Sequence, residues 1–244
     1  MLAWDGCLNV RDLGGHPTED GSVTRFGAVV RADSIRQMSE AGWAALTDYG
    51  VSRILDLRFH EELEADPPRE LDVEVVHVPV FPHPDTGAWE ELDKLSAAAP
   101  DHATATRDVY LAVLLLLPER FAEAVEAVAD APEGAVVVHC VGGKDRTGLV
   151  TALLLRLAGV GIADIAADYA LSGANLRERA RPWIEEAETD EERRRRERIS
   201  ATPAEAMTGV LEELQRRYGG VAGYLRAGGA SDEVLERARA RLRS

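Results

Sequence analysis

The sequence predicts one α/β domain over residues 1–244, with a mostly parallel central sheet flanked by helices. The run at 135–138, A-V-V-V, is short, apolar and β-branched, which is typical of a strand buried on both faces of a parallel sheet. From Thr147 a longer apolar run extends to Gly159, which fits a buried helix that ends at a glycine. A helix over 39–50, followed directly by a strand at 51–57, is a second step of the α/β kind.

The other elements follow from periodicity and from helix and turn signals. Strands are expected at 28–31 and 73–80, the latter interrupted by Pro79. Helices are expected at 108–117, 119–130, 162–171, 204–218 and 231–243. The segment 173–203 is strongly charged and has glutamate and arginine at i,i+4 spacing, which is typical of an exposed helix.

Composition and charge exclude several classes of function. The net charge of −15 argues against a nucleic-acid-binding surface. The apolar run 111–117 is far shorter than the ~20 residues that cross a bilayer, and no signal peptide is recognised at the start. Two cysteines 133 positions apart form no metal or disulfide framework. We therefore expect no metal, no cofactor, no transmembrane segment and a cytoplasmic location, with leaderless export left open.

The loop between the strand at 135–138 and the following helix carries the chemical signal. Cys140 begins it, Arg146 follows six residues later, and a glycine pair allows the backbone to curl. Its N–H groups and the positive end of the helix dipole form an anion site that favours the thiolate of Cys140. Arg146 offers a planar fork to two oxygens, so the expected ligand is a phosphate monoester. The predicted binding residues are Val141, Gly142, Gly143, Lys144, Asp145 and Arg146.

The residues His139, Cys140, Gly143 and Arg146 match the H-C-x-x-G-x-x-R signature of cysteine-dependent protein tyrosine phosphatases. The full run H-C-V-G-G-K-D-R-T-G resembles a bacterial subgroup of that family. The resemblance extends through N-V-R-D-L-G-G at 9–15, V-R-A-D-S at 30–34, D-L-R at 56–58, A-D-Y at 167–169 and G-Y-L-R at 223–226. It implies the protein tyrosine phosphatase fold and a helical lid near 173–203.

We expect a phosphomonoester hydrolase that acts through a phosphocysteine intermediate on Cys140. Arg146 and the N–H groups of the loop bind the phosphate oxygens and stabilise the transition state. Thr147 is expected to donate a hydrogen bond to the sulfur, and His139 to orient the loop. The partners are a phosphorylated protein or a phosphoinositide as substrate and inorganic phosphate as product.

Three assignments stay open at this point. The proton donor is Asp85, in the proline-rich loop F-P-H-P-D at 81–85, or Asp145; Asp85 fits an ordinary turn aspartate equally well. Arg58 follows a strand end and is expected near the phosphate, or else on the surface beside Asp56 or Glu61. Lys144 is expected either to meet a second phosphate, as phosphoinositide phosphatases of this type do, or to point into solvent.

Substrates include phosphotyrosine and, by resemblance, phosphoserine, phosphothreonine and phosphoinositides. Two other classes of protein also place a cysteine on such a loop: a rhodanese-like sulfurtransferase and a non-catalytic phosphate-binding module. The six-residue spacing from Cys140 to Arg146 and the following Thr147 favour the phosphatase.

Overall fold

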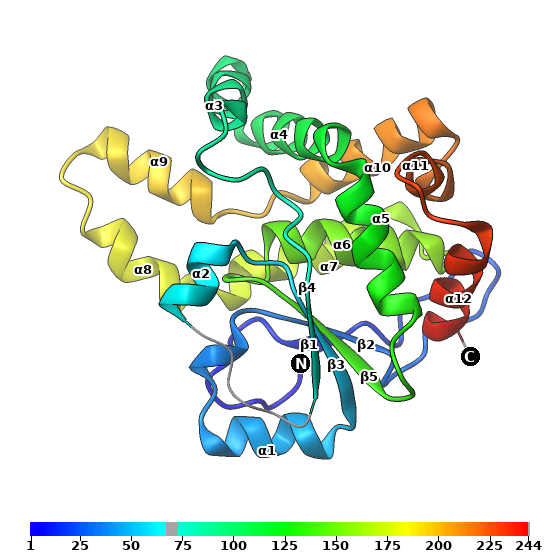
Figure 1. Cartoon of the computed structure of the whole chain (residues 1–244). Helices are drawn as coiled ribbons and strands as arrows, with labels where there is room; N and C mark the ends of the chain where they lie inside the picture. The colour runs from blue at the N-terminus through cyan, green and yellow to red at the C-terminus, as the bar shows by residue number, and fades with distance from the viewer. Residues whose placement is uncertain (67–72, 244) are drawn as a thin grey trace.

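The computed structural model describes residues 1–66 and 73–243, and these contain a five-stranded sheet (Figure 1). The order is β1-β2-β5-β3-β4, with β1 at Arg11–Asp12, β2 at Val29–Ala32, β3 at Val51–Asp56, β4 at Glu74–His77 and β5 at Ala135–His139. Only the edge strand β1 pairs in the antiparallel sense within this sheet. The predicted mostly parallel sheet is confirmed.

Strand β5 lies at the centre of the sheet, and all five of its residues are buried. Because side chains alternate along a strand, Val136 and Val138 enter the larger of two hydrophobic cores, while Ala135 and Val137 enter the smaller one. This explains the unbroken apolar run in the sequence, since each face of β5 has its own core to fill.

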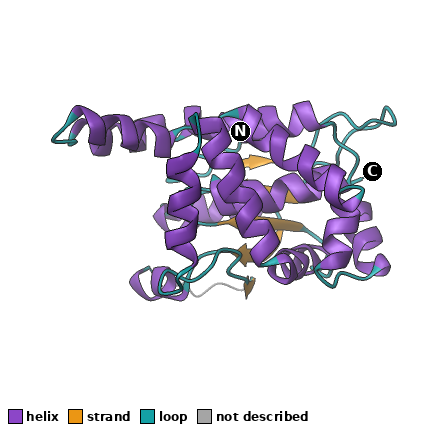
Figure 2. Cartoon of the chain, turned by 90° about the horizontal axis from the view of Figure 1, so that it is seen from above, coloured by secondary structure: helices purple, strands orange, loops and turns teal. Residues whose placement is uncertain are grey.

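Helices cover both faces of the sheet, as Figures 1 and 2 show. The smaller core lies under α1 (Glu40–Asp48) and the short 3-10 helix η1 (Ile35–Gln37). The remaining helices are α2 His60–Ala65, α3 Ala88–Ala98, α4 His102–Leu116, α5 Pro118–Ala129, α6 Asp145–Leu157, α7 Ile162–Asn175, α8 Arg177–Glu185, α9 Asp190–Ser200, α10 Ala204–Tyr218, α11 Val221–Ala227 and α12 Asp232–Leu242. The larger core is built mainly from α4 to α7 and α10 to α12.

Several boundaries differ from those predicted. The strand expected at 73–80 is β4 and ends at His77, because Pro79 offers no N–H to continue the ladder. The helix expected from residue 108 begins at His102, where the carboxylate of Asp101 accepts a hydrogen bond from the N–H of Thr104 at 2.8 Å. Helices α2, α3 and α11 and strand β1 were not predicted, since they are short or lack a regular apolar stripe.

The charged segment forms α8 and α9, which run away from the body of the molecule as a pair (Figure 1). Neither helix has a fully buried residue. Arg196 of α9 donates to the carbonyl of Trp183 and lies over its indole ring, at 5.2 Å from Cζ to the centroid. The two helices are therefore held to each other more than to the core. No helix within the described residues is long and apolar enough to cross a membrane.

Candidate active site

Cys140 lies in the loop that joins β5 to α6, and Arg146 lies in the first turn of α6. The helix begins at Asp145, two residues before the predicted start. Cys140 is only 2% exposed. Gly143 has φ of 60°, and a Cβ there would lie 2.3 Å from the carbonyl oxygen of Ala32. The loop therefore packs directly on the end of β2 and requires glycine at this position.

Two side chains hold the loop carbonyls. The Asn9 amide donates to the carbonyls of Gly142 and Gly143, each at 3.0 Å, and Arg31 Nη2 donates to that of Gly143 at 2.8 Å. Within the described chain, the backbone N–H groups of 142–147 donate to no protein acceptor. Free N–H groups at the start of a helix form the anion site that the sequence predicts.

A buried carboxylate joins two arginines beneath the loop. Arg11 Nε donates to Asp168 Oδ1 at 2.6 Å and Arg31 Nη1 to Asp168 Oδ2 at 2.5 Å, with none of the three side chains more than 6% exposed. Burial raises the pKa of Asp168, but the charges of Arg31 and Arg11 outweigh it and lower the pKa to about 2. The carboxylate thus fixes Arg31, which in turn holds the carbonyl of Gly143.

Arg146 forms a two-pronged ion pair with Glu62 of α2. Its Nη1 lies 2.5 Å from Glu62 Oε2 and its Nη2 lies 3.0 Å from Oε1, while Cζ lies 4.9 Å from the centre of the Phe59 ring. Burial alone would lower the pKa of Arg146, but the hydrogen bonds that it donates to Glu62 and the charge of Cys140 raise it. Among the described residues, no acceptor pairs with its Nε. That edge of the guanidinium is therefore left for an oxyanion.

His139 lies between the loop and a buried aspartate. Its Nδ1 lies 3.3 Å from the carbonyl oxygen of Cys140, and its Nε2 lies 3.4 Å from Asp56 Oδ2. Burial raises the pKa of Asp56, but its hydrogen bonds with His139 and Arg58 lower it well below its usual range. These are the contacts expected of a residue that orients the loop.

The guanidinium of Arg58 is paired with carboxylates and does not form an anion-binding group. It is 1% exposed, so the alternative that placed it on the surface is wrong, although its partner is indeed Asp56. Its Nη2 lies 2.8 Å from Asp56 Oδ2, and its Nη1 lies 3.0 Å from Asp66 Oδ2. The guanidinium is fully engaged by these carboxylates, and a contact with substrate phosphate has no support in its surroundings.

The Thr147 side chain is completely buried. Its hydroxyl has no hydrogen-bond partner within the part of the chain that the structure describes. Since Cys140 Sγ is not a partner of this hydroxyl either, the hydrogen bond expected from Thr147 to the sulfur is not formed in this structure and stays a prediction.

The two carboxylates considered as proton donors lie in different places. The side chain of Asp85 is 90% exposed, 3.5 Å from His83 Nδ1, and lines none of the cavities near the loop. Asp145 borders the same cavity as Arg146, and its Oδ1 accepts a hydrogen bond from Tyr110 at 2.5 Å. Tyr110 is itself 2.9 Å from the Tyr169 hydroxyl, which holds it in place. The structure therefore brings only Asp145 to the loop.

The cavity at the loop, called here the loop cavity, has a volume of about 440 Å³. Its walls near Arg146 are aromatic and aliphatic, from Phe59, Phe81, Trp89, Leu92 and Val109. An apolar wall beside an anion site suits an aryl phosphate, because the ring packs on the wall while the phosphate meets the loop.

Lys144 does not project into solvent. Its side chain is 13% exposed, its Nζ lies 3.6 Å from Asp145 Oδ1, and it donates a hydrogen bond to the carbonyl of Ile199 near the end of α9. The lysine thus ties the charged helix pair to the loop. Its ammonium group is already engaged, which weakens the expectation that it meets a second phosphate.

Sequence reasoning gave no role to several residues that shape this site, among them Asn9, Glu62 and Asp168. Asn9 and Asp168 lie in the segments N-V-R-D-L-G-G and A-D-Y that carry the family resemblance. The resemblance therefore pointed to their positions but not to their roles. Glu62 gave no signal, since a glutamate in an acidic run is normally solvated.

Comparison with known proteins agrees with this geometry. A model of the tyrosine phosphatase family matches residues 2–244. A tyrosine-protein phosphatase of Nostoc commune is 31% identical over 88% of this chain and 74% of its own length. The triple specificity protein phosphatase PtpB of Mycobacterium tuberculosis is 26% identical over 96% of both chains. These matches favour a phosphatase over the sulfurtransferase and the binding module, and the chain belongs to the tyrosine phosphatase family.

Proposed function

We propose that this protein-tyrosine phosphatase hydrolyses phosphotyrosine through a phosphocysteine intermediate on Cys140. The Cys140 thiolate attacks phosphorus, the bond from phosphorus to the ester oxygen breaks, and the leaving oxygen takes a proton from Asp145. A water molecule then attacks the phosphocysteine and gives its proton to Asp145. Inorganic phosphate leaves, and the thiolate is restored.

The arrangement of Cys140 and Arg146 around the loop carries this proposal. The free N–H groups of 142–147 and the Nε edge of Arg146 supply donors for the equatorial oxygens, which gain charge in the transition state. The predicted hydrogen bond from Thr147 would stabilise the sulfur as a leaving group in the second step.

The walls of the loop cavity favour phosphotyrosine over other monoesters. A phosphoserine side chain is too short to fill the space against Phe59 and Trp89, and an inositol ring would place hydroxyl groups against them. Phosphoserine, phosphothreonine and phosphoinositides remain predictions, supported by the similarity to a triple specificity protein phosphatase. The engagement of Lys144 removes the observation in this chain that favoured lipids.

The intermediate is tested directly by rapid denaturation in detergent during turnover of a ³²P-labelled phosphotyrosine peptide. Label should stay on the protein through the phosphorus–sulfur bond of phosphocysteine, in chelator, and should be absent in Cys140→Ser. That variant should keep its fold and its affinity for the peptide, because serine preserves the loop but is not ionised at neutral pH. Turnover within about tenfold of the wild type in Cys140→Ser would contradict the mechanism.

The lid of residues 173–203 also belongs to this proposal. Arg195, Ile199 and Ala201 border the loop cavity, and Lys144 holds the end of α9 against the loop. The end of α9 thus borders the loop cavity, which supports the lid that the resemblance implies. A substrate that enters the loop cavity passes beside α9.

A further inference from the structure

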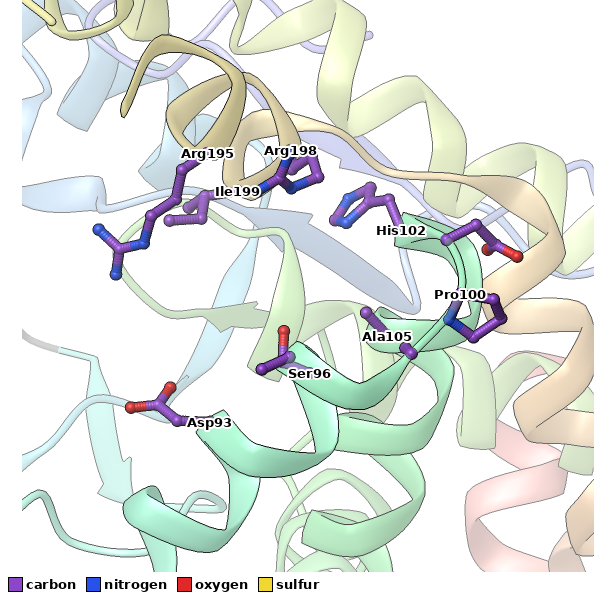
Figure 3. Close-up of a pocket in the computed structure, with 11 residues that line it drawn as sticks. Asp93, Ser96, Pro100, His102, Ala105, Arg195, Arg198 and Ile199 are labelled. Atoms are coloured by element: carbon purple, nitrogen blue, oxygen red, sulfur yellow. The ribbon is translucent and has the colours of Figure 1, made fainter. Parts of the chain in front are cut away.

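A second cavity of about 570 Å³, called here the side cavity, adjoins the loop cavity (Figure 3). The two share lining residues from α3, α4 and α9: Asp93, Ser96, His102, Ala105, Arg195 and Ile199. A molecule bound in the loop cavity therefore lies beside the side cavity. None of the steps proposed above uses this space.

Two arginines of α9 border the side cavity without partners. Arg195 and Arg198 are three residues apart and lie near one another along one side of the helix (Figure 3). Within the described residues, neither forms an ion pair or a hydrogen bond through its side chain. Their neighbour Arg196, by contrast, pairs with Glu192 at 2.5 Å and packs on Trp183. The two arginines that line the side cavity are thus ones whose guanidinium groups form no ion pair or hydrogen bond within the described helix pair.

A histidine on the opposite wall reports the charge of this space. His102 Nε2 is buried and has no hydrogen-bond partner among the described residues. Burial, and then the charges of Lys144 and Arg198, lower the pKa of His102. Lys144 and Arg198 thus lie close enough to His102 for their charges to act on it, although the whole chain carries a net charge of −15. A ligand that pairs with the unpartnered arginines of this cavity is an anion.

Neither acidic residue of the side cavity forms an ion pair with the two arginines in the described structure. Asp101 is occupied as the N-cap of α4, where it accepts from the Thr104 N–H at 2.8 Å and from its hydroxyl at 3.1 Å. Asp93 lines the side cavity from α3, but in the described structure it lies beyond ion-pair distance of both arginines. Asp93 and Asp101 add negative charge to the lining, but in the described structure the N–H groups of both arginines are left without a carboxylate partner.

We infer that the side cavity binds an acidic side chain that flanks the phosphotyrosine of a peptide substrate. The inference rests on the proposed function, because the phosphotyrosine must first occupy the loop cavity. The apolar walls of Phe59, Phe81 and Trp89 receive the aryl ring, and the arginines beyond them receive an aspartate or glutamate of the same peptide. Specificity for acidic phosphopeptides would then come from the lid and not from the phosphate loop.

The test compares kcat/KM for two phosphotyrosine peptides that differ only in their flanking residues, Asp and Glu in one, Asn and Gln in the other. The variant is Arg195→Gln with Arg198→Gln. Because exposed ion pairs are individually weak, we expect the acidic peptide to lose about fivefold to tenfold and the neutral peptide less than about twofold. The acidic preference of the wild type should also shrink with added salt.

A matched control is Arg193→Gln with Arg194→Gln, which removes the same charge from α9 at exposed positions that border neither cavity. It should leave both peptides unchanged. Equal losses on both peptides in the Arg195 and Arg198 variant, or no loss on either, would overturn the inference. The inference would also be overturned if the Arg195 and Arg198 variant lost activity on a multiply phosphorylated inositide but not on the acidic peptide. That result would assign the cavity to lipid headgroups. Failure of the proposed function would look different from failure of this inference. The wild type would then hydrolyse neither p-nitrophenyl phosphate nor either peptide.

Discussion

Replacing Glu62 by Gln tests how the phosphate-binding arginine is held. The carboxylate accepts two hydrogen bonds from Arg146, at 2.5 and 3.0 Å, and one from the N–H of Phe59 at 2.6 Å. A glutamine of the same shape keeps one acceptor for Arg146 but turns an NH₂ group toward its second nitrogen. Arg146 then loses the fixed orientation that leaves its Nε edge facing the loop cavity.

The size of the effect follows from the exposure of the pair. Hydrogen bonds to charged groups are worth about 1.5 to 3 kcal/mol, and every 1.4 kcal/mol corresponds to about tenfold. The side chains are 12% and 28% exposed, so solvent screens the pair only in part. We therefore expect kcat/KM for p-nitrophenyl phosphate and for phosphotyrosine peptides to fall by about tenfold, with a raised inhibition constant for inorganic phosphate.

Steady-state kinetics with a thermal unfolding measurement checks this expectation. Glu61→Gln is the matched control, because Glu61 is 59% exposed, pairs with His83 and makes no contact with Arg146. It should stay within about twofold of the wild type. If Glu62→Gln instead raises activity and tightens phosphate binding, Glu62 competes with the substrate for Arg146 and the positioning argument is refuted.

The pH dependence of this pair has a definite sign. Burial raises the pKa of Glu62, but the hydrogen bond and charge of Arg146 outweigh it, so the pKa lies below its ordinary value of 4.5. A depressed carboxyl pKa contributes stability that is present above pH 4.5 and is lost as the pH falls below it. Activity assays carried out above about pH 5.5 should therefore show no transition from Glu62.

Asp145→Asn should lower kcat for alkyl phosphates about tenfold more than for p-nitrophenyl phosphate, because the nitrophenolate anion leaves without a proton. Asp85→Asn should change neither rate. Equal losses on both substrates in Asp145→Asn would remove Asp145 from the acid role. Asp168→Asn leaves two buried guanidinium groups without their carboxylate and should lower the free energy of unfolding by about 3 to 5 kcal/mol in urea titrations. The contribution of Asp168 in the wild type should be present above its ordinary pKa of 3.8 and disappear as the pH falls toward about 2. Gly143→Ala forces a Cβ to 2.3 Å from the Ala32 carbonyl and should reduce kcat/KM by more than about tenfold; wild-type activity would show that the loop tolerates the shift.

Local sequence determined the centre of this molecule. A β-branched run, a glycine-containing loop and an amphipathic or apolar helix are decided by neighbours within a few residues, so 135–159 could be interpreted from the sequence almost to the residue. The spacing of Cys140 and Arg146 carried the chemistry for the same reason, since one turn of loop brings both to the same anion site. The mostly parallel sheet followed from the alternation of strands and helices.

Only the tertiary structure decided which side chains meet. Glu62 reaches Arg146 across 84 positions, and Asn9 reaches Gly143 across 134, so no local pattern contains either contact. Lys144 and Arg58 are ordinary cations in the sequence, yet packing engages one with the Ile199 carbonyl and buries the other between Asp56 and Asp66. Periodicity shows which face of an element is apolar, whereas the partner of a charged group depends on which distant element that face is packed against.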